Sequence, residues 1–205
     1  MESLVLGFLT AGSLILAIGP QNLFVIEQGL KKNFIFTVTT ICTVSDILLI
    51  FLGVFIYQIF NTISAEFEFV LNIILIFFLI RFIKEKINEL KNFKAKKVTG
   101  SNNLKKVVLK TLGFTYLNPH VYSDTIFILG NLSKNFDQES KFFFALGASL
   151  SSIIFFYSLG YMSSIFANFI KNKNIWKYIN IFIISFMSVL VTYIIYTAYL
   201  SIFNL

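Results

Sequence analysis

The chain has 205 residues, of which 57% are hydrophobic and 18% aromatic, and its mean hydropathy is +0.79. This composition excludes a soluble globular domain and predicts an all-α integral membrane protein, because the apolar runs are long enough to cross a bilayer. The net charge of +7 does not indicate a nucleic-acid partner, since ten of the 17 basic residues fall between positions 81 and 110 rather than over a folded surface.

Six transmembrane helices are expected. In chain order they cover about Leu4–Ile26, Phe34–Phe60, Phe67–Ile83, Val107–Leu129, Phe142–Ile170 and Trp176–Phe203. A basic segment divides them into two groups of three, so we expect a first three-helix repeat at 1–83, a cytoplasmic linker at 84–106 and a second three-helix repeat at 107–205. Because three is an odd number, the second group enters the membrane from the opposite side, and the expected repeats are inverted.

The distribution of lysine and arginine predicts the orientation. The loops after the expected first, third and fifth helices carry fifteen of these residues, and the opposite side carries only Lys134 and Lys141. The positive-inside rule then places the basic loops in the cytoplasm and both termini in the periplasm. The basic segment also suits anionic headgroups, so membrane lipids are expected partners.

The two prolines of the chain, Pro20 and Pro119, interrupt the first expected helix of each repeat. Each lies in a polar sequence, Gly-Pro-Gln-Asn at the first and Asn-Pro-His at the second. Proline removes a helix hydrogen bond, and the freed backbone groups at membrane depth must be satisfied by protein or face a polar cavity. Broken helices at corresponding positions of inverted repeats are typical of secondary transporters, with the substrate site where the breaks meet.

Two carboxylates lie inside the expected helices, Asp46 and Asp124, and no lysine or arginine lies at comparable depth. A charge at the bilayer centre costs about 2.5–3.5 kcal/mol on insertion scales, so these groups require protons or a positive ligand. The pattern predicts a cationic substrate exchanged for protons at a midplane site. The alternative is that both carboxylates only cap backbone amides freed at the breaks.

Polar residues around the two breaks complete the predicted site. The helix that resumes after each break begins with unpaired N–H groups, which suit a carboxylate, so an amino acid with a basic side chain would be matched at both ends. Substrate-binding candidates are Asp46, Asp124, Gln21, Asn22, Asn118 and Tyr122, helix breaks are Pro20 and Pro119, and proton-coupling candidates are Asp46, Asp124 and His120. For the amides the alternative is bonding to the broken backbone, for His120 it is a neutral ring bonded to freed carbonyls, and for Tyr122 it is packing.

Signatures of an enzyme or a metal protein are absent from the sequence. The single histidine cannot form a zinc-protease pair, and there is neither a Gly-x-Ser-x-Gly elbow nor a Walker loop. The lone Cys42 allows no internal disulfide and carries no metal-site spacing. We therefore expect a non-enzymatic protein without cofactor or resident metal, driven by ion gradients.

Glycines spaced four residues from another small residue predict close contacts between helices. Gly7 with Ala11 and Gly147 with Ser151 are two such pairs. Small residues at this spacing let helix backbones approach closely within a membrane. We expect these faces to serve packing rather than chemistry.

Three segments, Gly19–Gly29, Ser45-Asp46 and Leu117–Thr125, resemble the LysE family of bacterial amino-acid exporters, most closely its lysine and arginine exporters. The hydrophobic layout and the basic central segment extend this resemblance over the whole chain. It implies a multi-pass protein of the bacterial inner membrane that exports L-lysine or L-arginine by proton antiport, with Asp46 and Asp124 as its central acidic residues. Ser123 stands where related exporters often carry an aliphatic residue, which leaves arginine versus lysine open.

Alternatives to this interpretation remain at the level of sequence. Within transport they are a neutral amino acid or a metal cation as the substrate. Outside transport the alternative is a membrane scaffold whose breaks act as hinges for partner binding. The sequence does not decide whether the protein is a homo-oligomer.

Overall fold

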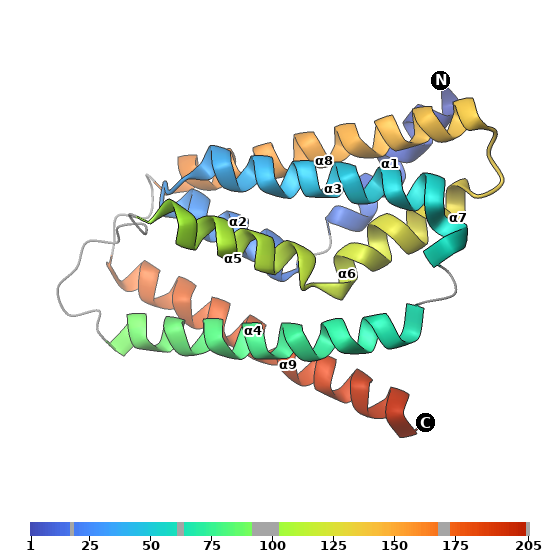
Figure 1. Cartoon of the computed structure of the whole chain (residues 1–205). Coiled ribbons are helices and arrows are strands. Elements are labelled where there is room, and N and C mark those ends of the chain that lie inside the picture. Colours follow the sequence, from blue (N-terminus) through green and yellow to red (C-terminus); the bar gives the residue numbers. More distant parts are fainter. Residues whose placement is uncertain (17–18, 61–63, 92–102, 168–172, 204–205) are drawn as a thin grey trace.

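The computed structural model describes residues 1–16, 19–60, 64–91, 103–167 and 173–203, which form helices and no strands (Figure 1). The elements are α1 (Glu2–Ile15), α2 (Pro20–Leu30), α3 (Ile35–Phe60), α4 (Ser64–Lys91), α5 (Leu104–Tyr116), α6 (Pro119–Tyr122), the π-helix η1 (Ser123–Ile128), α7 (Leu129–Ser133), α8 (Gln138–Phe166) and α9 (Lys173–Phe203). The expected all-α class is confirmed. Residues 17–18 and 168–170 of the expected spans and 92–102 of the expected linker lie outside the described residues.

The six expected spans are not confirmed. Among the described residues, three stretches are long and apolar enough to cross a membrane alone: Ile35–Ile56 in α3, Gln138–Phe166 in α8 and Lys177–Tyr196 in α9. The bent pair of α1 and α2, whose axes differ by 80°, gives a fourth span if it is counted as one.

The two remaining expected spans are not among these stretches of the described residues, and different features of the chain divide them. In α4 the apolar stretch between Glu68 and Arg81 holds twelve residues, about 18 Å of helix, which is less than the hydrocarbon core of a bilayer. The expected span Val107–Leu129 is divided among α5, α6, η1 and α7, none of which is long enough by itself. Pro119 predicted the break in the second of these spans, whereas the count of apolar residues did not take account of the charges that limit α4.

The helices of the first half pack mainly on helices of the second half. α1 and α2 contact α8, α3 contacts α5, η1 and α7, and α4 pairs with α9, whereas α3 and α8 contact each other directly. Figure 1 shows α4 and α9 along one side of the bundle and α1, α3 and α8 along the other, with α5 to α7 between them. The two broken helices are therefore enclosed by elements from both halves.

Glycines allow α1 and α8 to approach backbone to backbone. A Cβ atom on Gly7 would collide with the carbonyl oxygen of Phe144, and one on Gly147 would collide with the carbonyl oxygen of Leu4. Any larger residue at either position would push the two helices apart. The close contact predicted at Gly7 and Gly147 is confirmed.

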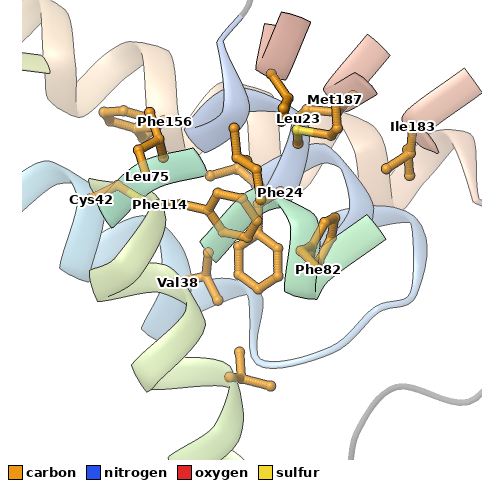
Figure 2. Close-up of a cluster of buried hydrophobic side chains, with 14 of the residues drawn as sticks. Leu23, Phe24, Val38, Cys42, Leu75, Phe82, Phe114, Phe156, Ile183 and Met187 are labelled. Carbon is orange, nitrogen blue, oxygen red and sulfur yellow. The ribbon is translucent and has the colours of Figure 1, made fainter. Parts of the chain in front are cut away.

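The largest hydrophobic cluster joins α2, α4 and α5 on the side of the breaks that leads toward the basic segment. Phe24 of α2 stacks on Phe114 of α5 with ring centroids 4.8 Å apart, and Phe82 of α4 meets Phe114 edge-on at 4.9 Å. Figure 2 shows these rings together with Cys42 of α3 and Met187 of α9. This packing closes the space between the half-helices α2 and α5.

Ion pairs tie the same three helices together where α4 ends and α5 begins, a region we call the basic end. The Glu27 carboxylate lies 2.5 Å from Lys86 Nζ and 2.6 Å from Lys31 Nζ, and the Glu27 and Lys86 side chains are only 3% and 1% exposed. Glu85 lies 2.7 Å from Lys110 Nζ and 2.9 Å from Lys106 Nζ, nearer to solvent. Thus α2 is anchored to α4 by a buried ion pair and α5 by a partly exposed one.

Candidate functional site

A cavity of about 360 Å³ lies between the two broken helices, within the range of about 300–1,000 Å³ that is usual for small-molecule sites. Its walls come from α1, α2, α3, α8 and α9 and from the segment that follows Asn118. The polar residues lining it are Ser13, Gln21, Asn22, Asp46, Asn118, His120, Asp124, Thr125 and Ser152. The structure thus places residues next to both prolines, together with Asp46 and Asp124, around one cavity.

At the first break, Asn22 reaches back across the gap between α1 and α2. Its side-chain Nδ2 donates a hydrogen bond to the carbonyl oxygen of Ile15 at 3.0 Å. Pro20 begins α2, where its missing N–H removes no helical bond, and Gly19 before it is extended. The first residues of α2 line the cavity, and the backbone N–H groups of a first helical turn have no acceptor in a preceding turn.

At the second break, two side chains satisfy the backbone that Pro119 frees. Asn118 Oδ1 accepts a hydrogen bond from the backbone N–H of His120 at 3.2 Å. The hydroxyl of Tyr122 donates to the carbonyl oxygen of Tyr116 at 2.7 Å. Tyr122 does not belong to the cavity lining. Its hydroxyl bonds to the broken backbone, and the substrate contact expected from the sequence stays a prediction.

The chain resumes after Tyr122 as a π-helix, which no sequence signal predicted. Residues Ser123–Ile128 form this wider helix, and Asp124 lies in its first turn. Single π-turns occur frequently at functional sites because they change the direction in which side chains point. Ser123, whose hydroxyl the resemblance connected with the choice between arginine and lysine, does not belong to the cavity lining.

The two aspartates face the same cavity in different surroundings. Asp46 is 5% exposed, and its Oδ2 accepts a hydrogen bond from the hydroxyl of Ser152 at 3.1 Å. Asp124 is half-buried, and His120, one turn earlier, is the basic side chain close enough to act on its charge. The carboxylates also interact electrostatically with each other. No lysine or arginine lines the cavity among the described residues, so it carries negative charge without an internal cation.

Gln21 adds a donor to this negative cavity. Its side chain is 5% exposed and lies within interaction range of the Asp46 carboxylate, and its Nε2 has no acceptor of ordinary hydrogen-bond geometry among the described residues. A buried amide without a partner is costly unless a ligand or water completes it. Among the described residues there is no group of three or more histidine, cysteine, aspartate or glutamate side chains that could hold a metal ion.

Ser152 and Thr125 line the cavity and were not among the sequence candidates. A signal for Ser152 exists in the sequence, since Ser151-Ser152-Ile153 in the second half matches Ser45-Asp46-Ile47 in the first. The sequence held no such signal for Thr125, because threonine is common in membrane helices. In the structure its hydroxyl donates to the backbone oxygen of Val121.

The fold and the cavity together define a helical, multi-pass membrane protein of the transporter class. Residues 12–198 match the family described as LysE type translocator, and the chain belongs to this family. The family resemblance seen in the sequence is thereby confirmed.

Curated relatives cover most of the chain. The lysine exporter LysE of Corynebacterium diphtheriae is 29% identical, with 88% of this chain and 93% of that protein aligned. The arginine exporter protein ArgO of Pectobacterium atrosepticum is 30% identical, with 86% and 88% aligned. ArgO of Klebsiella pneumoniae is also 30% identical, with 85% and 84% aligned. No solved structure gives a significant match to the chain.

Proposed function

We propose that the protein exports basic L-amino acids, L-arginine or L-lysine, across the bacterial inner membrane. The observation that carries this proposal is the cavity between the breaks, which contains two carboxylates, Asp46 and Asp124, and no lysine or arginine among the described residues. A charged cavity inside a membrane protein is stabilised by an opposite charge, and a basic amino acid supplies one. The relatives named for lysine and arginine export support the same substrate class.

In this proposal the two ends of the amino acid meet different parts of the cavity. The cationic groups bind the carboxylates of Asp46 and Asp124. The α-carboxylate accepts hydrogen bonds from the first turn of α2. Asn22 and Asn118 contribute mainly by holding the broken backbone in place, because their amides bond to Ile15 and His120.

The capping alternative for the aspartates is less well supported. The hydrogen bond that Asp46 accepts comes from a side-chain hydroxyl, and the backbone at the breaks is bonded by Asn22, Asn118 and Tyr122 instead. The carboxylates therefore remain available for a proton or a cation.

Transport proceeds by alternating access, with a proton exchanged for the amino acid at Asp46 and Asp124 and with His120 beside Asp124 assisting the proton. Two inverted halves that rock against each other fit the contacts of α3 with α8 and of α4 with α9, since these join corresponding helices. The lysines at the basic end support an orientation in which this end faces the cytoplasm and both termini face the periplasm.

Counterflow of labelled arginine and lysine into vesicles containing the purified protein tests this function. We expect uptake of at least one of the two, stimulated by a pH gradient and lowered at least about 100-fold in Asp46→Asn. The matched control is Asp137→Asn, because Asp137 is an exposed aspartate just before α8 and outside the cavity. Uptake of neither amino acid would overturn the proposal, and efficient competition by neutral amino acids or by divalent cations would replace its substrate.

A further inference from the structure

The hydroxyl of Ser152 is the group that holds Asp46 in the cavity. Ser152 Oγ donates to Asp46 Oδ2 at 3.1 Å, across 106 positions of the chain, so that one partner comes from α3 and the other from α8. The side chain of Ser152 is 1% exposed and that of Asp46 5% exposed. Both residues line the cavity. The contact is therefore a buried link between the two halves at the proposed substrate site.

Other serines of α8 show that this contact is not the default for a serine in this helix. Ser149 Oγ donates to the carbonyl oxygen of Ala145 at 2.7 Å, and Ser163 Oγ donates to that of Leu159 at 2.6 Å. Both bonds return to the preceding turn of the same helix, which is the usual choice of a helical serine. Ser152 instead directs its hydroxyl across the interface to a carboxylate.

The chemistry of the bond explains what it does to Asp46. A hydrogen bond from a hydroxyl to an ionised carboxylate is stronger than one between neutral groups, and it fixes the plane of the carboxylate. With Oδ2 held by Ser152, Oδ1 is the atom left to meet a ligand cation in the cavity. A carboxylate that is free to rotate would lose part of its affinity to the entropy of being ordered on binding.

The repeat in the sequence gives this pair a particular position. When Ser45-Asp46-Ile47 is aligned with Ser151-Ser152-Ile153, Asp46 and Ser152 correspond to each other, and they meet where α3 packs on α8. An identical residue at both places would set two carboxylates within hydrogen-bond distance, and they could not both be ionised. The serine leaves one carboxylate and supplies it with a donor.

We propose that Ser152 is a positioning residue that acts through Asp46 and sets the affinity of the cavity for the cationic substrate. This proposal rests on the proposed export of basic amino acids. The loss of one hydrogen bond to a charged group predicts that Ser152→Ala raises the KM for arginine or lysine counterflow about tenfold, with little change in the maximal rate. Ser152→Thr retains the hydroxyl and restores affinity toward that of the wild type.

Two controls separate positioning from a merely structural role. Ser149→Ala removes a buried hydroxyl from the same helix outside the cavity lining and leaves the KM unchanged. Binding of labelled arginine to the detergent-solubilised protein provides a double-mutant cycle: Ser152→Ala weakens binding about tenfold when Asp46 is present and adds no further loss in the Asp46→Asn background.

Each outcome decides the proposal. A KM for Ser152→Ala equal to that of the wild type overturns it, and so does a fall in protein yield and maximal rate at constant KM, or an equal loss of binding in both backgrounds. If the wild type takes up neither amino acid, the proposed function fails, and the positioning role fails with it. Normal wild-type uptake together with an unaffected Ser152→Ala overturns the positioning role alone.

Discussion

At the first proline break, α1 and α2 meet at 80°, whereas at the second α5 ends at Tyr116 and the chain resumes as α6, followed by the π-helix η1 and α7. The sharp bend exposes the start of α2 to the cavity, with Asn22 holding the end of α1. At the second break Asn118 is extended, and the helix that resumes at Pro119 passes into the π-helix whose first turn carries Asp124. Two similar sequence patterns thus make two parts of one site, one supplying backbone donors and the other a carboxylate.

The aspartates continue this contrast. Asp46 is buried and held by Ser152, while Asp124 is half-buried beside the exposed His120. A buried carboxylate that is held in place contributes most of the binding energy for a cation, because water screens the attraction of a carboxylate nearer to solvent. In the proposed function Asp46 would therefore be the anchor for a cation, and Asp124 would adapt to the rest of the ligand.

The largest effect is expected from removing the anchor. Asp46→Asn should lower uptake at least about 100-fold, because one partner of a desolvated charge pair is lost, whereas Asp124→Asn should lower it about tenfold. Initial rates of arginine and lysine counterflow measure both. A greater loss in Asp124→Asn than in Asp46→Asn would reverse the assignment of anchor and adaptable carboxylate.

The half-helices α2 and α5 are held to α4 by different ion pairs, one buried and one partly exposed. Stability measurements test this difference. Glu27→Gln should lower the free energy of unfolding in detergent by about 3–5 kcal/mol, because it removes the charge opposite the buried Lys86. The matched change Glu85→Gln, at the partly exposed pair, should cost less than about 1 kcal/mol. Equal losses would show that burial does not distinguish the two anchors.

Removing the side-chain amides of Asn22 and Asn118 tests which of the two breaks depends more on its amide for stability. Asn22→Ala should cost about 1–3 kcal/mol because the Ile15 carbonyl loses its donor, and Asn118→Ala about 1 kcal/mol as the loss of an ordinary helix cap. Thermal unfolding of the two variants in detergent gives the order. A larger cost at Asn118 would contradict it.

Tyr122→Phe separates backbone support from substrate contact at the second break. The lost bond to Tyr116 should cost about 1 kcal/mol of stability, while the KM stays at the wild-type value because the hydroxyl does not line the cavity. Counterflow kinetics and thermal unfolding are compared with those of Tyr157→Phe, whose hydroxyl bonds to Thr40 outside the site. A raised KM in Tyr122→Phe alone would return the residue to the binding site.

The smallest effect is a pH dependence at the anchor of α5. Burial raises the pKa of the Glu85 carboxyl, but the hydrogen bonds and charges of Lys110 and Lys106 outweigh burial and hold the pKa below its ordinary value of 4.5. A lowered pKa in the folded state contributes stability above pH 4.5 that is lost as the pH falls through the folded-state value. Unfolding curves of wild type and Glu85→Gln should differ at neutral pH and converge in acid. Curves that stay parallel would show that the pair contributes nothing.

Prolines and intramembrane charges made the centre of the site predictable. Proline must break a helix, so Pro20 and Pro119 predicted the two breaks. A carboxylate is too costly to face lipid, so Asp46 and Asp124 were expected inside the protein. The π-helix could not be foreseen in this way because it depends on packing: a Cβ on Gly53 of α3 would collide with the carbonyl oxygen of Thr125. The bond of Ser152 to Asp46 likewise depends on which faces of α3 and α8 meet.

The number of spans is confirmed only in part, since three or four candidate spans are found among the described residues. Hydropathy averages over a window, and α4 combines apolar turns with Glu68 and Arg81, while the segment after Leu104 is apolar but repeatedly interrupted. The length of a helix depends on where its backbone hydrogen bonding stops, and an average of hydropathy does not indicate that position.

Cys42 gives the molecule an intrinsic reporter. It is the sole sulfhydryl of the chain, 0% exposed, and it lies in the cluster that Phe24 and Phe114 close, beside Gln21. Maleimide reagents reach such a thiol only when α2, α3 and α5 separate. The rate of alkylation of the unmodified protein, with and without arginine, would therefore count openings of this cluster without any engineered label.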